Sequence, residues 1–136
     1  VSFVLLSRNL HDWMSTPGEP KKAMRDFYAA LKPGGILAVE QHRADPHPMK
    51  PDASDGYMST AVVVKLAEGA GFKLAATSEI NANPRDTKDH PFGVWTLPPT
   101  RRSAPNGQPL NPTFDHAKYD AIGESDRMTL KFINPE

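Results

Sequence analysis

The chain has 136 residues, the length of one ordinary domain, and its 16 basic residues balance its 16 acidic residues. This balance excludes a general electrostatic attraction to nucleic acid or to an acidic membrane surface. The chain also lacks a run of about 18 apolar residues, the length that a membrane-spanning helix needs. The chain contains no cysteine, which excludes disulfides, thiol catalysis and cysteine-ligated zinc. We expect a cytoplasmic protein, and a periplasmic one is also compatible with this composition.

The first apolar segment, residues 1–7, suits a strand that is buried on both faces. We expect no signal peptide before it. It opens on Val1 without Met, so we expect a fragment, a processed product or a shortened chain. After a turn at residues 15–18, Pro20 favours the start of a helix. The apolar residues of this helix recur at helical spacing and form one stripe, consisting of Ala23, Met24, Phe27, Tyr28 and Leu31.

A sharp turn separates this helix from a second strand. Pro33 disfavours helical geometry at Lys32, and Gly34 and Gly35 supply the permissive backbone that a helix-to-strand turn needs. The apolar run that follows, Ile36–His42, is the predicted second strand.

The segment 45–55 contains three prolines, so we predict a loop there. A second helix is expected from about residue 59 to residue 68, with Gly69 and Gly71 ending it. Residues 73–80 form the predicted third strand.

Residues 84–112 contain half of the chain's 14 prolines, which predicts a long excursion with little regular structure. Residues 91–98 are an apolar island within it that we expect to dock on another part of the molecule. The alternating segment Arg127–Ile133 is the predicted last strand. Helices between successive strands imply parallel pairing, whereas the last strand has no helix before it and should be antiparallel. The sequence therefore predicts one α/β domain over residues 1–136.

Four quoted segments carry a family resemblance, and together they span the chain. They are LLSRNLHDW, FYAALKPGGILAVEQHRA, GYMSTAVVVKLAEGAGFKLAATSEI and YDAIGESDRMTLKFINP. The chain resembles the C-terminal half of class I S-adenosylmethionine-dependent methyltransferases, which have a Rossmann-like fold, and within them a bacterial group of predicted small-molecule methyltransferases. The resemblance implies a partial sheet whose strands are equivalent to 4-5-7-6 of the family's seven, with the last strand antiparallel.

The family binds its cofactor mainly through a Gly-rich loop after its first strand and an acidic residue after its second. Neither element is present in this sequence. Gly34 and Gly35 follow a helix and precede a strand, which is the reverse of a nucleotide-binding loop. Because these elements are missing, the resemblance implies a truncated methyltransferase-like protein. The cofactor that the resemblance implies is S-adenosylmethionine.

The residues after the first strand are the main candidates for the site, because ligands of open α/β sheets bind beyond the carboxyl ends of the strands. By resemblance, Arg8, Asn9 and Leu10 would border the cofactor. His11 would act as a general base towards the acceptor and Asp12 would tune it. The alternative is that His11 and Asp12 cap the next element or form hydrogen bonds across the sheet.

Three further residues, His42, Tyr57 and Trp95, are candidates for binding the acceptor, and Phe92 accompanies Trp95. The alternative for the two aromatic residues of the Pro-rich segment is that they anchor it on the core. His42, Asp45 and His47, with Asp52 and Asp55 nearby, are residue types that suit a divalent metal ion. Their spacing matches no helical or ribbon-type site, so we predict no metal and an ordinary polar loop.

The function that the resemblance implies is methyl transfer from S-adenosylmethionine to a small-molecule acceptor. Two alternatives remain open: a non-catalytic oligomeric remnant, and a repurposed enzyme that uses His and Asp residues at the strand ends. In the family, the strand formed by residues 1–7 would pair with a strand that is missing here, which leaves an open apolar edge. We expect this edge to pair with its counterpart in a homodimer.

Overall fold

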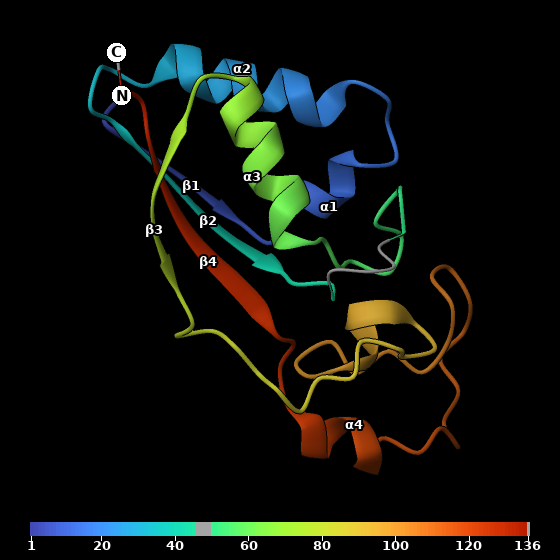
Figure 1. The fold of residues 1–136 in the computed structure, drawn as a ribbon. Coiled ribbons are helices and arrows are strands. Elements are labelled where there is room, and N and C mark those ends of the chain that lie inside the picture. Colours follow the sequence, from blue (N-terminus) through green and yellow to red (C-terminus); the bar gives the residue numbers. More distant parts are fainter. Residues whose placement is uncertain (46–49, 136) are drawn as a thin grey trace.

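The computed structural model describes residues 1–45 and 50–135 (Figure 1). The strands are β1 (Phe3–Ser7), β2 (Ile36–His42), β3 (Lys73–Ser78) and β4 (Arg127–Ile133). The helices are α1 (Leu10–Trp13), α2 (Glu19–Ala30), α3 (Thr60–Gly69) and α4 (Ala117–Ile122), with a short 3₁₀ helix, η1 (Gly93–Thr96). In the two described ranges, no helix is long and apolar enough to cross a membrane.

The four strands form one sheet in the order β1-β2-β4-β3. β1 and β2 are parallel, and β4 runs antiparallel to both of its neighbours. This arrangement confirms the predicted α/β class, the antiparallel last strand and the 4-5-7-6 order. The bounds of β2 and β4 are those that the sequence predicts, whereas β3 ends at Ser78, two residues earlier than expected.

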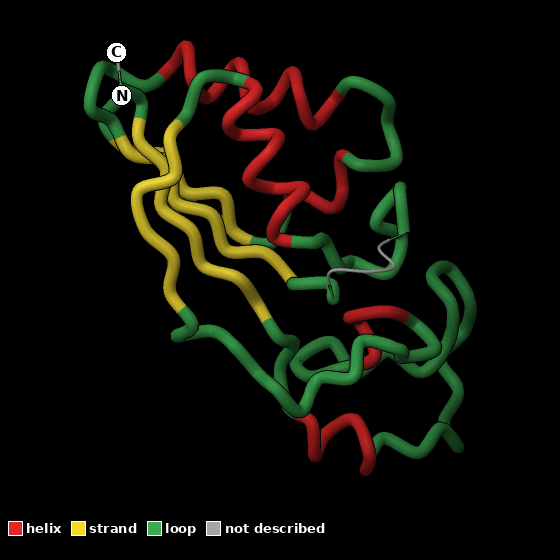
Figure 2. The backbone as a smooth tube through the Cα atoms, in the orientation of Figure 1, coloured by secondary structure: helices red, strands yellow, loops and turns green. Residues whose placement is uncertain are grey.

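One face of the sheet carries the hydrophobic core, and α2 and α3 cover it (Figures 1 and 2). Alternation along the strands turns Leu37 and Val39 of β2 and Phe132 of β4 towards these helices, where at most 1% of each is exposed. Met24 of α2 and Val63 of α3 are fully buried against them. The predicted apolar stripe of α2 therefore faces the sheet.

Local signals explain where α2 and α3 begin. Gly18 has a φ of 81°, in the left-handed region that glycine favours, and Pro20 occupies the first turn of α2. The Ser59 side chain accepts a hydrogen bond of 3.3 Å from the Val62 N–H and caps α3.

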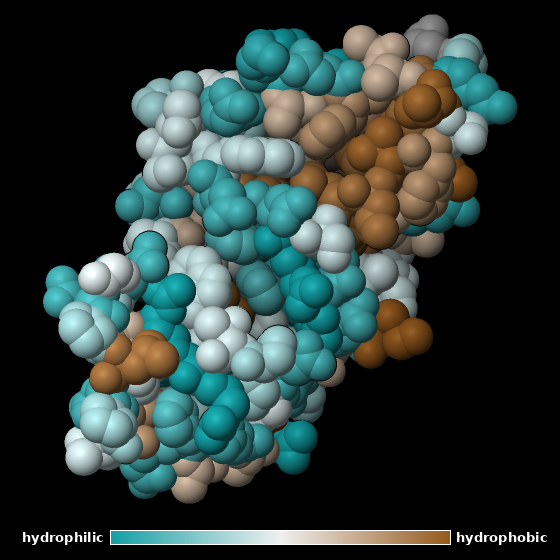
Figure 3. Space-filling model, turned by 180° about the vertical axis from the view of Figure 1, so that it is seen from behind, coloured by the Kyte–Doolittle hydropathy of each residue, from teal (hydrophilic) through white to brown (hydrophobic). Residues whose placement is uncertain are grey.

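The opposite face of the sheet is open, and its apolar part gathers near the amino end of β1. The strand register places Phe3 beside Ile36, and Ile36 beside Ile133, on this face. Phe3 is 54% exposed and Leu5 is 62% exposed. Figure 3, which shows the molecule from behind, displays the resulting apolar patch. β1 is also an edge strand, so one side of its backbone is without a neighbouring strand in the described chain.

Residues 79–126 link β3 to β4 and lie beyond the ends of β2 and β4 (Figure 1). Most of this segment is irregular, as its prolines predict, but it includes η1 and α4. The helices α1 and α4 are not among the elements that the sequence predicts. They have four and six residues, too short for an apolar stripe to develop.

Candidate functional site

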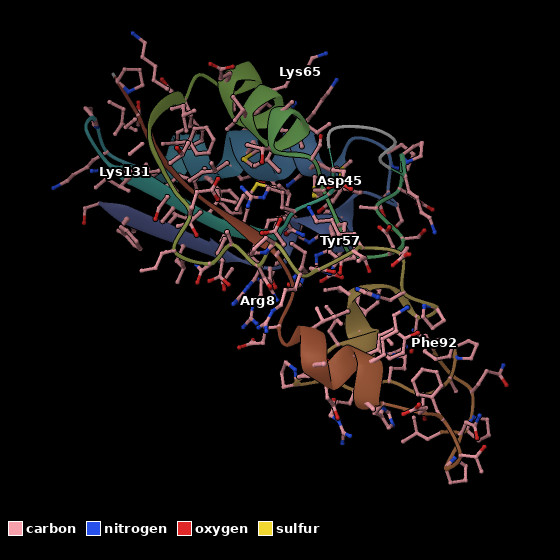
Figure 4. The ribbon with its side chains drawn as sticks, turned by 60° about the horizontal axis from the view of Figure 1, so that its bottom comes forward. Arg8, Asp45, Tyr57, Lys65, Phe92 and Lys131 are labelled. Carbon is pink, nitrogen blue, oxygen red and sulfur yellow. The ribbon has the colours of Figure 1, made fainter. Side chains whose placement is uncertain are left out.

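A pocket of about 320 Å³ lies at the carboxyl ends of β1 and β2, closed on one side by the segment 79–126. This volume is within the range of small-molecule sites. Figure 4 labels Arg8 at this end of the sheet and Phe92 in the segment beyond it. The lining residues come from three parts of the chain: Ser7, Arg8, Asn9, His11 and Asp12; His42; and Val94, Trp95, Pro98, Pro99, Thr100, Glu124 and Ser125.

The turn after β1 positions the first group of these side chains. The Arg8 N–H donates a hydrogen bond of 2.6 Å to the Glu40 carbonyl, which continues the β1–β2 pairing by one residue. Arg8 then adopts a φ of 58°, a left-handed conformation that costs a non-glycine residue about 1 kcal/mol or more. This sharp reversal starts α1 directly at the strand end. It brings His11 and Asp12 to the pocket wall.

His11 is held between the protein interior and the pocket, and only 7% of it is exposed. Its Nδ1 lies 2.9 Å from the side-chain nitrogen of Gln41. Its Nε2 lies 3.2 Å from Oδ1 of Asp12, whose side chain is 63% exposed. The ring centroid of His11 is 5.5 Å from that of His42 and 5.7 Å from that of Trp95. The two histidines and the tryptophan therefore form one aromatic cluster in the pocket wall.

His42 is in an environment that disfavours a positive charge. Its Nδ1 forms a hydrogen bond of 2.5 Å with the Ser125 hydroxyl. Burial, together with the electrostatic effect of the nearby His11, Arg8 and Arg127, lowers the pKa of His42 to about 3. His42 is therefore neutral at physiological pH and serves as a hydrogen-bonding group rather than as a charge.

A buried polar network holds the segment 79–126 against the strand ends. Asp86 accepts hydrogen bonds from the Tyr57 hydroxyl at 2.9 Å, from His90 Nε2 at 2.8 Å and from the Asp126 N–H at 2.9 Å. Burial alone would raise the pKa of Asp86, but these hydrogen bonds lower it overall. The Asp86 carboxylate thus ties together the segment before α3, the Pro-rich segment and the residue before β4.

Asp126 forms a second junction in the same network. Arg43 donates to both of its oxygens, at 2.9 and 3.0 Å, and Lys88 Nζ lies 3.0 Å from Oδ2. Burial opposes ionisation of Asp126, but the hydrogen bonds from Arg43, Lys88 and the Asn83 N–H bring its pKa down to about 2. The two junctions fix the position of Trp95 and the prolines that follow it at the pocket.

Of the predicted site residues, the pocket brings together Arg8, Asn9, His11, Asp12, His42 and Trp95. It does not include Leu10, which is fully buried in the core. It also does not include Tyr57, which is 1% exposed and directs its hydroxyl to Asp86. Among the described residues, no group of three or more His, Asp or Glu side chains could hold a metal ion. His47, one of the metal candidates, lies outside the described residues.

Gln41, Glu124 and Ser125 are not among the predicted site residues. Glu124 and Ser125 reach the pocket only through the fold, and no local pattern marks them. Gln41 did carry a signal, because it occupies the inward-facing register that Leu37 and Val39 occupy in β2. A fully buried glutamine at a core position indicates a specific hydrogen-bonding partner.

Comparison with known proteins adds evidence on the fold. No protein-family model matches the chain, and no curated protein matches it by sequence. Among solved structures, the [4+2]-cyclase SpnF matches 98% of this chain with a TM-score of 0.55 and 15% identity. A candidate S-adenosylmethionine-dependent methyltransferase from Listeria monocytogenes matches 100% of it, with a TM-score of 0.52 and 12% identity.

The chain spans 49% of the SpnF chain and 62% of the Listeria chain. At these identities the likeness concerns the fold alone. The described sheet, with its parallel pair, its antiparallel β4 and its helices, is therefore an S-adenosylmethionine-dependent methyltransferase-like fold, matched over about half of the length of those proteins.

Proposed function

We propose that this chain forms the acceptor side of an S-adenosylmethionine-dependent methyl-transfer site for a small molecule. The observation that carries the proposal is the position of the pocket. It lies at the carboxyl ends of β1 and β2, where ligands of open α/β sheets bind, in a sheet with methyltransferase-like strand order. Its size suits a small molecule.

The described residues fit one side of such a cofactor. Asp12 and Glu124 line the pocket, and in the described chain neither carboxylate pairs with a lysine or arginine. Two unneutralised carboxylates suit a ligand with a positive centre. Arg8 and Asn9 would border the cofactor. When bound, S-adenosylmethionine supplies an electrophilic methyl group on a positively charged sulfur.

The part of this chain in the reaction is to position the acceptor and remove its proton. Trp95, Pro98 and Pro99 line one side of the pocket and restrict where an acceptor can lie. The pair formed by His11 and Asp12 is the proton-handling group, since a hydroxyl or amine acceptor must lose a proton as it is methylated.

The proposal includes a second copy of the chain at the edge of β1. The Ile36 N–H donates to the Ser2 carbonyl and the Arg8 N–H donates to the Glu40 carbonyl, so even-numbered residues of β1 direct their backbone groups to β2. Since these directions alternate along a strand, Phe3, Leu5 and Ser7 direct theirs to the open edge. Antiparallel pairing about a two-fold axis at Leu5 would satisfy all three in both copies. It would also bring the partner's amino end beside Asn9, at the pocket.

Calorimetric titration with S-adenosylhomocysteine, the transfer product, tests the proposal. We expect binding at micromolar concentration. No binding at millimolar ligand would overturn the proposal and favour a non-catalytic oligomeric domain.

A second titration, with S-adenosylmethionine, isolates the role of the carboxylates, because the two ligands differ in the methyl group and charge at sulfur. The variant Asp12→Asn should weaken binding of S-adenosylmethionine about two- to five-fold more than that of S-adenosylhomocysteine, as expected for a partly exposed ion pair. The control is Glu68→Gln, because Glu68 is exposed on α3 and does not line the pocket. This variant should leave the ratio of the two affinities unchanged.

A further inference from the structure

We infer that Gln41 fixes His11 as a hydrogen-bond donor, so that Asp12, rather than His11, takes the acceptor's proton. The assignment of Asp12 as proton acceptor rests on the proposed function. The assignment of the His11 hydrogen bonds does not, because it follows from the geometry of Gln41.

The amide of Gln41 can point in only one direction. Gln41 is fully buried, and its side-chain nitrogen lies 2.9 Å from His11 Nδ1 and 3.1 Å from the Gly56 carbonyl oxygen. A carbonyl oxygen only accepts hydrogen bonds. Exchanging the nitrogen and oxygen of the amide would place two oxygens in contact without a hydrogen between them. The NH₂ group of Gln41 therefore donates one hydrogen to Gly56 and the other to His11.

This direction sets the tautomer of His11. Because Nδ1 accepts a hydrogen bond, it carries no proton, and the neutral ring carries its proton on Nε2. Nε2 faces Oδ1 of Asp12 at 3.2 Å. The lone pair of His11 therefore points into the protein, and only an N–H is available on the side of the pocket. His11 cannot accept a proton from an acceptor in the pocket without breaking its contact with Gln41.

Asp12 has the exposure and the free acceptor oxygen that a proton acceptor in the pocket needs, and His11 lacks both. Its carboxylate lines the pocket, and its side chain is 63% exposed. One oxygen, Oδ1, lies 3.2 Å from His11 Nε2, and the other remains for the acceptor. The proton would then pass from the acceptor's oxygen or nitrogen to Asp12, and the electron pair that it leaves would form the new bond to the methyl carbon. The bond between that carbon and sulfur would break at the same time, and its electron pair would stay on the sulfur of S-adenosylhomocysteine.

The unpaired oxygen of Gln41 supports a positioning role. Gln41 Oε1 is buried and has no hydrogen-bond partner in the described chain. A buried oxygen without a hydrogen-bond partner destabilises the fold, so an apolar residue at this position would give a more stable core. The two hydrogen bonds of the NH₂ group are what a glutamine adds here.

Nitrogen NMR of the histidine rings in the intact chain tests the inference without any substrate. Near pH 8, His11 should show an unprotonated Nδ1 and a protonated Nε2. The Gln41→Leu variant should lose this preference, while His90, which donates from Nε2 to Asp86, keeps its spectrum. A protonated Nδ1 on His11 in the unmodified chain would overturn the inference.

A second experiment distinguishes a failure of this inference from a failure of the proposed function. Once an acceptor is found, Asp12→Asn should lower kcat about 100-fold or more, as expected for loss of a general base. His11→Gln, which retains an N–H donor, should keep more activity than His11→Ala. If the two His11 variants are equally inactive, His11 is the base and the inference fails. If the NMR result holds but neither cofactor form binds, the proposed function fails and the tautomer assignment stands.

Discussion

His42 shows how strongly the pocket controls a single side chain. It is flanked by His11, Arg8 and Arg127, and each of them adds to the effect of burial. A neutral imidazole near Ser125 can accept or donate one hydrogen bond, depending on its tautomer. The pocket wall therefore remains uncharged at this point even in mildly acidic solution.

We predict that His42 makes the stability of the fold depend on pH below 6.5. Its pKa is about 3 in the folded chain and about 6.5 when unfolded, so between these values only the unfolded chain takes up the proton. The free energy of unfolding should fall by about 1.4 kcal/mol for each pH unit below 6.5, until about pH 3. Denaturation at several pH values measures it, and His42→Gln should remove this contribution. A ring that titrates near pH 6.5 by NMR would contradict the prediction.

The segment between β3 and β4 is held by close backbone approach as well as by its polar network. Val94 N–H donates a hydrogen bond of 2.9 Å to the Asp55 carbonyl. Gly93 adjoins this contact with a φ of 62°, and a Cβ there would lie 2.6 Å from the same carbonyl oxygen. Glycine is required at this position because the two segments touch through their backbones.

We predict that Gly93→Ala undocks the segment, whereas Gly107→Ala does not. Both positions have positive φ, which costs an alanine about 1–2 kcal/mol. Only Gly93 adds a steric clash, because nothing lies within 4 Å of a Cβ at Gly107. The clash should destabilise the fold by about 1–3 kcal/mol more. Urea denaturation followed by tryptophan fluorescence compares the two variants, and equal losses would show that the backbone contact is unimportant.

At the scale of the molecule, one face of the sheet lacks a covering element in the described chain, and β1 and β3 both lie at open edges. The helices α2 and α3 lie on the same side, and the apolar patch with Phe3 and Leu5 lies on the other (Figures 1 and 3). An open apolar edge strand favours pairing with another strand. The proposed second copy would extend the sheet across the β1 edge, and the patch beside it would become continuous between the copies.

We predict a dimer of the 14.9 kDa chain that the variant Leu5→Lys converts to a monomer. Leu5 is 62% exposed, so the substitution removes edge pairing without disturbing the core. Ile80→Lys is the matched control, because Ile80 is 79% exposed and lies after β3, away from the β1 edge. Sedimentation velocity distinguishes the species. A clean monomer of the unmodified chain at high concentration would refute the second copy as the partner.

Local patterns determined most of the fold. The sequence predicts three elements and their burial because their patterns depend only on neighbouring residues. These patterns are the alternation in Arg127–Ile133, the apolar run Ile36–His42 and the stripe in α2. The helix α1, which the sequence does not predict, depends on the chain reversal at Arg8, and no neighbouring residue indicates this reversal.

The site is different because its contacts join distant positions. The sequence identified the strand ends and placed His11, Asp12 and His42 there, by the rule that ligands bind at the carboxyl ends of strands. Only the tertiary structure decided that Gln41 reaches His11 across 30 positions and that Ser125 reaches His42 across 83. Hydrogen-bond direction depends on which atoms meet in space, and periodicity along a chain specifies which face a residue takes but not which partner it finds there.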